Sequence, residues 1–576
     1  MDTNSENLDL KTEFKRMDIA LGNQLADVVF KNATYFNPFT REFSKGDIAV
    51  SDGIIAGIGN YSGVIEHDMT GLYLTAGLID SHIHFESSMV TPDEYARAVV
   101  PRGVLTVIAD PHEVANVDGI AGVEFLLRYS KTSPLNIKIM MPSCVPASPY
   151  ENSGAALTWP ELKKLLAHDN VIGLGEMMDF PGVVAKDPVP HAKLKAAKGM
   201  IIDGHAPFLS GKGLNAYIAA GVQTDHECST LMEMGEKLAL GMNILIREGT
   251  GAKNADLLLQ GVNQKNLHRV MFCTDDHHPS DLLAQGTVDH VVNLALKHGF
   301  SMADALLMAT FNPARTYQLD GVGAIAPGYR ADLAAFDSLE HFSARAVYIG
   351  GALVAEGLKP LWETKPETVE QPNSVKLFDW TKADLKMPLT GQPSHVLGLR
   401  DNDLTTDLLI QQFTGEEFTP DENYAKLVLM ERHHALPLMG KAILKGYGIQ
   451  NGAVASTVAH DAHNLIIAGD NDRDILLAMA EIKRIKGGIV LVAQGEVIGC
   501  LPLPILGLMT GAGLDGVSHE LAHLEELAHD VLKINPRINP FLSLSFLALP
   551  VIPDVKITCR GLYSLTRDQL LPMNVE

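Results

Sequence analysis

The sequence predicts an α/β protein: a (β/α)8 barrel of the TIM type with a small composite β domain and an additional C-terminal α/β domain. Three observations predict it. Eight short apolar runs alternate with stretches of helical periodicity in residues 75–319, as a parallel barrel requires. Segments of alternating apolar and polar residues lie on both sides of this region. A third region with its own strands and helices follows them.

The chain is long enough for several domains, because its 576 residues exceed the roughly 250–300 residues at which single cores stop growing. We expect the two flanking β segments to pair into one domain, with the barrel inserted between them. The expected division is an N-terminal tail at 1–24, the composite β domain at 25–74 and 320–370, the barrel at 75–319 and the C-terminal domain at 371–576.

Composition excludes several classes of protein. The formal net charge of −23 argues against nucleic acid or anionic membranes as partners, because both attract stripes of Lys and Arg. The five cysteines lie far apart without a CxxC spacing, which is typical of a reducing compartment. The polar N-terminus has no apolar stretch of the kind that a secretory signal contains. We therefore expect a cytoplasmic protein, and the charge leaves a small neutral substrate open.

Ionisable residues follow the apolar runs of the barrel region. The candidate strands are LTAGLIDSHIHF, VLTVIAD, IKIMMPS, VIGLGEM, MIIDGHA, VQTDHEC, NILIREG and RVMFCTDD. Nearly every run has polar or ionisable residues at its C-terminal end. The carboxyl ends of barrel strands form the active-site face, so these side chains indicate an active site there.

The residue types at these strand ends are those of a metal centre. His82 and His84 are two apart, so on a strand both imidazoles face the same side. The other candidate ligands end later strands in chain order: Glu176, His205, His226 and Asp275. Six nitrogen and oxygen donors suit two divalent cations better than one. Imidazole and carboxylate without thiolate fit Mn, Fe or Zn.

Each of these residues has a simpler interpretation. A single His or Glu at a strand end is more often a hydrogen-bonded polar residue or a helix cap. Six of them in order along one predicted barrel favour the metal centre.

Two further motifs are weaker. His519 and His523 match the HExxH zinc pattern, but their helix already has an apolar core face and lacks a third ligand, so we place both on a solvated or interface face. Asp461 and His463, in HDAHN, are either residues that close over the barrel mouth or residues of a plain turn.

The motifs taken together resemble the amidohydrolase superfamily. AGLIDSHIH, a ligand on the fourth strand, single histidines on the fifth and sixth and Asp275 on the eighth carry the likeness. Glu176 stands where many members have a carboxylated lysine, which is similar to the adenine deaminase branch. HIHFESSM, MPSCVPA, IREGTGAKN, TDDHHP and HDAHN also look like that branch, and the resemblance covers residues 25–570.

The resemblance implies hydrolysis of a C–N bond in a cyclic amidine: adenine and water give hypoxanthine and ammonia, a step of purine salvage and catabolism. It implies two divalent metal ions, with Mn expected first and Fe or Zn as alternatives, whose shared water attacks the purine. His82, His84 and Asp275 would hold one metal and His205 and His226 the other. Glu176 would bridge them.

The resemblance leaves the proton transfers to be assigned. Asp275 is the candidate for taking the proton of the attacking water, with Glu176 as its catalytic neighbour. By position at strand ends, His112, Glu86, Glu113 and Glu248 are candidates for protonating the ring nitrogen, with His112 and Glu86 taken as the catalytic ones. The substrate-binding candidates are Glu113, Glu248 and Ser87. The alternative for these residues is hydrogen bonding that supports the metal ligands.

Two other hypotheses for the function remain open. One is another amidohydrolase reaction, such as hydrolysis of a cyclic amide, whose enzymes use a bridging lysine that this chain lacks at Glu176. The other is a non-catalytic scaffold, which would not need all six ligand positions filled. The expected partners are adenine and a second copy of the chain in a homodimer.

Overall fold

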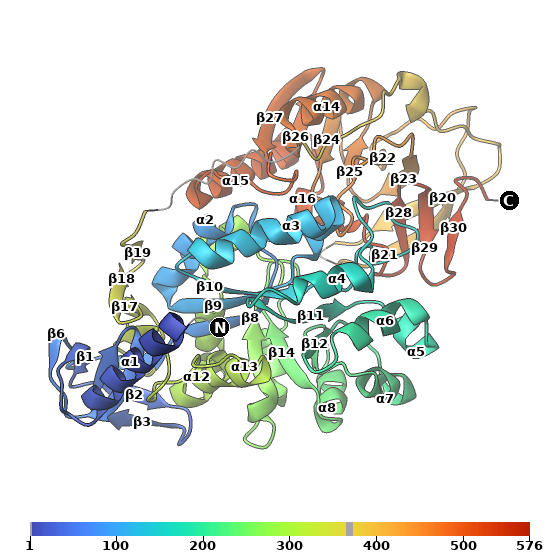
Figure 1. Ribbon diagram of the computed structural model, residues 1–576. Helices are drawn as coiled ribbons and strands as arrows, with labels where there is room; N and C mark the ends of the chain where they lie inside the picture. The colour runs from blue at the N-terminus through green and yellow to red at the C-terminus, as the bar shows by residue number, and fades with distance from the viewer. Residues whose placement is uncertain (1–2, 364–372, 402, 576) are drawn as a thin grey trace.

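The computed structural model describes residues 3–363, 373–401 and 403–575, with side chains described from residue 10 onward. Figure 1 shows the barrel at the centre, the β domain at lower left and the C-terminal domain at upper right. The domain boundary expected at 370/371 lies outside the described residues.

The eight expected barrel strands are all present. They are β8 (Leu78–Ile83), β9 (Val104–Ala109), β10 (Asn136–Met141), β11 (Val171–Met177), β12 (Ile201–Gly204), β13 (Thr224–Asp225), β14 (Asn243–Arg247) and β15 (Val270–Cys273). Neighbouring strands within β8–β12 and within β13–β15 pair in parallel. The Gln223 N–H donates to the Ile202 carbonyl, and the Asp275 N–H donates to the His82 carbonyl. These two links close the barrel that the sequence predicts.

Helices cover the outside of the barrel (Figure 1). They form where apolar residues recur at helical spacing, as Val288, Val291, Val292 and Ala295 do on α11, whose buried stripe faces the strands. The helices are α2 (Pro92–Val99), α3 (His112–Thr132), α4 (Trp159–Leu165), α5 (Phe180–Ala185), α6 (Pro188–Ala196), α7 (Gly211–Ala219), α8 (Leu231–Ala239), α9 (Ala255–Leu258), α10 (Pro279–Ala284), α11 (Val288–Lys297), α12 (Met302–Ala309) and α13 (Phe311–Thr316).

The two segments that flank the barrel share one β domain. Strand β7 before the barrel pairs antiparallel with β16 after it, with Leu74 opposite Ala335. One sheet has the order β5-β4-β1-β6 and the other β19-β18-β17-β16-β7-β2-β3. The strands are β1 (Ala26–Lys31), β2 (Thr34–Asn37), β3 (Glu42–Lys45), β4 (Asp47–Ser51), β5 (Ile54–Gly59), β6 (Gly63–Asp68), β7 (Tyr73–Ala76), β16 (Leu333–Phe336), β17 (Ala344–Ile349), β18 (Ala352–Glu356) and β19 (Lys359–Pro360).

The N-terminal segment differs from the expected tail. Residues Thr3–Ala20 form helix α1, which packs on the β domain through Ile19, buried among Val29 and Ala49. Lys15 forms ion pairs with Asp27 and Asp52. The sequence gives no sign of a buried face on this helix, because Ile19 is the one apolar side chain that its described residues bury fully, while Leu10, Phe14 and Met17 are exposed.

The C-terminal domain contains an eight-stranded sheet in the order β21-β20-β23-β22-β25-β24-β26-β27. The expected helix DRDILLAMAEIKRI is α14 (Asp472–Ile485), which buries Ile475, Met479 and Ile482 against the sheet. The strands are β20 (Ser394–Leu399), β21 (Thr406–Gln411), β22 (Tyr424–Met430), β23 (Met439–Lys445), β24 (Gly452–Ser456), β25 (Leu465–Gly469), β26 (Gly488–Ala493) and β27 (Glu496–Pro502). Helix α16 (Pro540–Phe546) and the small sheet β28 (Val555–Thr558), β29 (Gly561–Ser564) and β30 (Gln569–Leu571) follow.

Helix α15 (Leu514–Asp530) carries the HExxH match. Its buried face consists of Leu514, Val517, Leu521, Leu524 and Ala528, and both His519 and His523 lie on the exposed side. Within the described ranges, the helices include none with the length and apolar character needed to cross a bilayer.

Candidate active site

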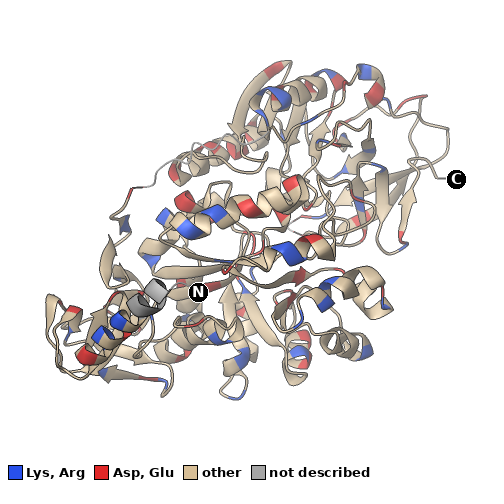
Figure 2. Cartoon of the chain, in the orientation of Figure 1, with Lys and Arg blue, Asp and Glu red and all other residues tan. Residues whose placement is uncertain are grey.

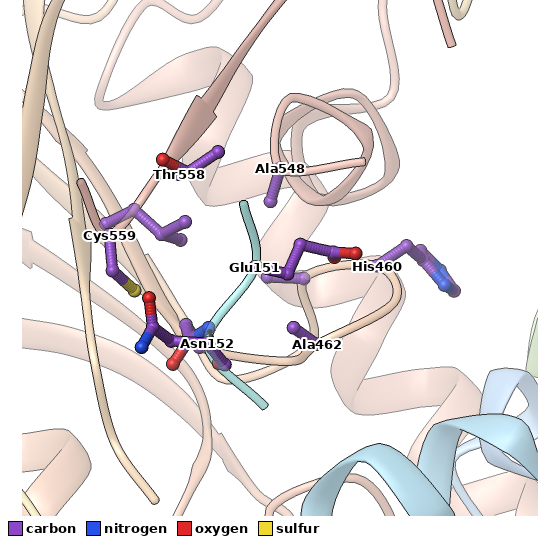
Figure 3. Close-up of a pocket in the computed structure, with 10 residues that line it drawn as sticks. Glu151, Asn152, His460, Ala462, Ala548, Thr558 and Cys559 are labelled. Atoms are coloured by element: carbon purple, nitrogen blue, oxygen red, sulfur yellow. Dashed lines mark hydrogen bonds between the residues drawn. The ribbon is translucent and has the colours of Figure 1, made fainter. Parts of the chain in front are cut away.

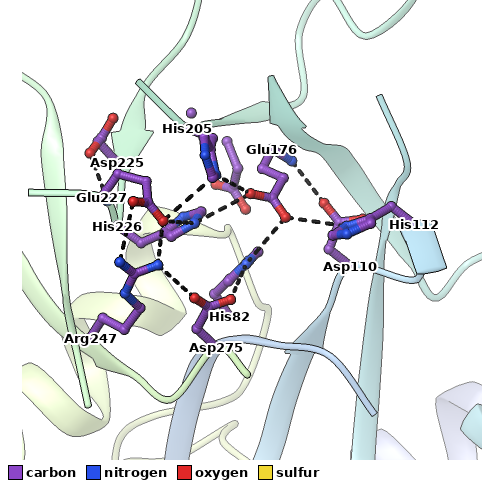
Figure 4. Close-up of polar contacts among 12 residues, drawn as sticks. His82, Asp110, His112, Glu176, His205, Asp225, His226, Glu227, Arg247 and Asp275 are labelled. Carbon is purple, nitrogen blue, oxygen red and sulfur yellow. Dashed lines mark hydrogen bonds and ion pairs between the residues drawn. The ribbon is translucent and has the colours of Figure 1, made fainter. Parts of the chain in front are cut away.

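All six predicted ligands meet at the mouth of the barrel. Each lies at or next to the C-terminal end of its strand, where the sequence has ionisable residues after an apolar run. Figure 4 shows Glu176 among His205, His226, His112 and His82, with the His82 ring between Glu176 and Asp275. The imidazoles of His82, His84 and His226 are buried, and the His205 side chain is 16% exposed.

One set of donor atoms surrounds Oε1 of Glu176 and Oδ1 of Asp275. The Nε2 atom of His82 lies 3.8 Å from Glu176 Oε1 and 3.5 Å from Asp275 Oδ1. For His84 Nε2 the same two distances are 3.5 and 3.0 Å. Ligand atoms that share one ion at about 2.0–2.2 Å lie roughly 3–3.6 Å apart. Three of the four distances lie in this range and the fourth is 3.8 Å, so the set is close to the spacing of a single coordination sphere.

A second set surrounds the other oxygen of the same carboxylate. Glu176 Oε2 lies 2.6 Å from His205 Nδ1 and 3.3 Å from His226 Nε2. Because each oxygen of Glu176 faces a different pair of imidazoles, one carboxylate joins the two sets.

The donor atoms fit divalent cations. Both ring nitrogens of His82 and Nε2 of His226 are buried without a hydrogen-bond partner among the described residues, which is costly unless another group satisfies them. Nδ1 of His84 lies 2.9 Å from the carbonyl oxygen of Asp110, and its proton on that atom leaves the Nε2 lone pair free for a metal.

The charges of the cluster depend on one another. Burial raises the pKa of Glu176, but contacts with His112, His205 and His226 hold it well below its usual range. Burial lowers the pKa of His226, but Glu176 raises it to about 9. Protons on the imidazoles thus balance the negative charge of the Glu176 carboxylate, and bound cations would replace these protons.

An arginine that the sequence analysis missed supports the ligands. Arg247 Nη1 lies 2.7 Å from Asp275 Oδ2 and forms an ion pair with Glu227. Glu227 Oε1 in turn lies 3.5 Å from His226 Nε2. Burial raises the pKa of Asp275, but Arg247 first and then His82 and His84 keep it well below its usual range. Arg247 ends strand β14 and Glu227 directly follows His226. These positions at strand ends are the signal in the sequence that could have pointed to the two residues.

The two catalytic candidates lie beside the cluster. His112 Nδ1, at the start of α3, is 3.2 Å from Glu176 Oε1. Glu86 Oε1 accepts the Val114 N–H at 3.0 Å, and its Oε2 is buried without a partner in the described part of the chain. Burial, together with the nearby Glu113, raises the pKa of Glu86 to about 7.

The three substrate-binding candidates lie in different surroundings. The Ser87 hydroxyl donates to Asp276 Oδ1 at 2.5 Å, and Asp276 groups with His84 and Asp275. Glu113 faces the C-terminal domain, where it meets His460. Glu248 accepts the Ala255 N–H at the start of α9, so its observed contact supports the backbone and gives no support to a substrate-binding role.

The HDAHN motif lies over the barrel mouth. Asp461 and His463 are buried, and Asp461 Oδ1 is 3.7 Å from Nε2 of His112. Of the two readings that the sequence allows, this geometry favours closure over the barrel.

Comparisons with known proteins give the family. Residues 73–375 match the amidohydrolase family and residues 404–569 the adenine deaminase C-terminal domain. The chain is 44% identical to adenine deaminase 2 of Carboxydothermus hydrogenoformans, over 97% of this chain and 99% of the relative. It is 40% identical to adenine deaminase of Clostridium acetobutylicum over the same shares. The crystal structure of an enamidase, 20% identical, covers 57% of this chain and 96% of its own, with a TM-score of 0.44.

The matches to the family models and to the two adenine deaminases span nearly the whole chain, and they extend from the barrel into the C-terminal domain. The chain belongs to the amidohydrolase family, in its adenine deaminase branch.

Proposed function

We propose that this chain catalyses the hydrolytic deamination of adenine to hypoxanthine and ammonia. The observation that carries the proposal is the Glu176 carboxylate, whose two oxygens face separate pairs of imidazoles. Relatives that are named adenine deaminases support adenine as the substrate. The competing cyclic-amide reaction is disfavoured because its enzymes use a lysine at this position, where the chain has Glu176.

The proposed cofactor is a pair of divalent metal ions, Mn first and Fe or Zn as alternatives, since imidazole and carboxylate donors suit all three. His82, His84 and Asp275 would hold one ion, His205 and His226 the other, and Glu176 would join them. When bound, such ions act as Lewis acids that lower the pKa of water towards neutrality.

The residues around the donors then have defined tasks. Asp275 accepts a proton from the attacking water, and its contact with Arg247 fixes the carboxylate in place. The free oxygen of Glu86 protonates a purine ring nitrogen as water adds to C6. His112 holds Glu176, while Ser87 and Glu113 contact substrate. Ammonia leaves with the proton that Asp275 took from water, and the second proton of that water returns to Glu86 as the C6 carbonyl forms, so atoms and charge balance.

The test of the function is an assay with purified chain. With Mn or Fe supplied, adenine should disappear and hypoxanthine and ammonia should appear in equal amounts. Turnover of cyclic amides such as dihydroorotate or hydantoin without turnover of adenine would refute the proposal.

Removal of the metals should abolish activity and lower the melting temperature. Ligands that bind only the folded state stabilise it, by about 4 kcal/mol at a thousandfold excess over Kd. Elemental analysis should find close to two ions per chain before chelation, and added Mn should restore both activity and melting temperature. A chelated, metal-free chain with full activity would contradict the assignment.

We also propose that the chain forms a homodimer in the cytoplasm. The support for dimerisation is the outer face of α1 and the residue after it, where Leu10, Phe14, Met17 and Leu21 are 47–72% exposed. Their spacing of four, three and four residues makes a continuous apolar stripe. In the part of the chain that the structure describes, the cysteines are free thiols, which supports a reducing compartment.

Charge complementarity points to an antiparallel pair of α1 helices. Lys11 and Asp18 flank the stripe on the same side and are exposed, so antiparallel alignment brings Lys11 opposite the partner's Asp18. Figure 2 shows both signs of charge along this helix. The double variant Phe14→Glu, Met17→Glu should turn a dimer into a monomer in light scattering, with adenine turnover retained. A monomeric wild type at micromolar concentration, or a dimeric variant, would exclude this interface.

A further inference from the structure

A loop of the C-terminal domain reaches the active site. This capping loop (residues 459–464) connects β24 to β25 and includes the HDAHN motif. His460 Nδ1 lies 2.9 Å from Oε1 of Glu113, which belongs to the barrel helix α3. The His460 and Glu113 side chains are 5% and 2% exposed. The contact is thus a buried one between two domains.

A second path leads from the same loop to the metal ligands. Asp461 Oδ1 lies 3.7 Å from His112 Nε2, and Nδ1 of the same ring lies 3.2 Å from Glu176 Oε1. The imidazole of His112 therefore lies between a carboxylate of the C-terminal domain and the carboxylate that joins the two sets of donors.

The capping loop is held rigidly from its own domain. Arg432, which is fully buried, donates to the carbonyl oxygens of His463 and Leu506. His433 Nε2 lies 2.7 Å from the Ala462 carbonyl oxygen. Both contacts act on the backbone of the loop, so they set its position independently of the side chains that face the barrel.

The barrel holds the loop from the other side. The Asn464 amide donates to the Asn152 carbonyl at 2.7 Å. These residues line a small cavity between the domains. Figure 3 shows Glu151 beside the loop and the His460 ring pointing away from Cys559. The capping loop is therefore held by hydrogen bonds from both domains.

The group of Glu113, His460 and His463 also has the spacing of a metal site. The hydrogen bonds argue against a cation there. The Ala459 N–H donates to Nδ1 of His463, so the proton of the neutral ring is on Nε2, the atom that faces Glu113 at 3.8 Å. That nitrogen carries the ring proton and has no lone pair to offer a cation, and at 3.8 Å it makes no hydrogen bond to the carboxylate.

We propose that the C-terminal domain completes the active site, with His460 as a positioning residue for Glu113 and Asp461 as one for His112. The inference rests on the proposed deaminase function, in which both partners lie beside the metal ligands. The charges agree with it: burial raises the pKa of Glu113, but His460, whose Nδ1 lies 2.9 Å from the carboxylate, holds it below its usual range. Glu113 is thereby kept as an oriented anion.

The test uses two substitutions of His460 in the full-length, metal-loaded chain. Asn places its amide nitrogen near the position of Nδ1 and can still donate to Glu113, whereas Gln places it near Nε2 and cannot. His460→Gln should lower kcat about 10–100-fold, the usual range for groups that orient ligands, and His460→Asn should retain most activity. Metal content and melting temperature should stay at wild-type values in both. His434→Gln, an exposed histidine in the same domain, is the control and should be unchanged.

Asp461→Asn gives an independent test, since it keeps the shape of the side chain and removes the charge that faces His112. It should lower kcat with metal content intact. Full activity in His460→Gln and Asp461→Asn would overturn the inference, as would equal losses in His460→Gln and His460→Asn, or a third ion that is lost with His460→Gln. A wild-type chain inactive on adenine would instead refute the proposed function.

Discussion

Glu176→Gln should reduce the metal content from two ions per chain to one or none and reduce kcat by roughly 10³-fold or more. The amide keeps the size of the side chain but offers one neutral oxygen, so it cannot join His82 and His84 to His205 and His226. Loss of one ion removes several kcal/mol of transition-state stabilisation, at about 1.36 kcal/mol for each factor of ten. Elemental analysis and steady-state kinetics with adenine measure the two effects.

The matched control is Glu124→Gln, which changes an exposed carboxylate on α3 and should leave metal content and kcat unchanged. Two ions together with normal turnover in Glu176→Gln would show that this carboxylate does not bridge the metals. Melting curves of both variants separate loss of metal from loss of fold.

Glu86→Gln should lower kcat by about 10²–10⁴-fold, the range for loss of a general acid, while both ions stay bound. The Gln oxygen can still accept the Val114 N–H that holds Oε1 of Glu86. The other end of the side chain, whose oxygen is buried without a partner among the described residues, becomes an amide that cannot release a proton to the purine.

Metal analysis distinguishes this effect from that of Glu176→Gln, because only the latter should lose an ion. Rapid single-turnover measurements locate the defect in the chemical step rather than in product release. Turnover at the wild-type rate in Glu86→Gln would move the proton-donor role to another residue, with His112 next in line by its position beside Glu176.

Much of the barrel could be predicted because its signals are local. Each strand is a short apolar run, and the ligands end those runs in chain order, so the fold and the convergence of His82, His205 and Asp275 follow from one pattern. The pair of His82 and His84 shows the period of two that a strand imposes.

The missed residues have no such local pattern. Arg247 is defined by its partners Glu227 and Asp275 on neighbouring strands, and no spacing in the sequence gives that contact. His460 lies hundreds of positions from Glu113, so only the packing of two domains brings them together. Helix α1 was missed because it buries little apolar surface. Glu248 was proposed for substrate binding from its position at a strand end, and the contact observed there is with the backbone N–H of Ala255.

The pairing of β7 with β16 has a consequence for synthesis of the chain. Residues 73–76 expose a strand edge as they leave the ribosome, and their neighbour at residues 333–336 is translated only after the entire barrel. An unpaired edge of this kind is a template for pairing with other chains. Nascent chains stalled before residue 333 should therefore need a chaperone more than those stalled after residue 360.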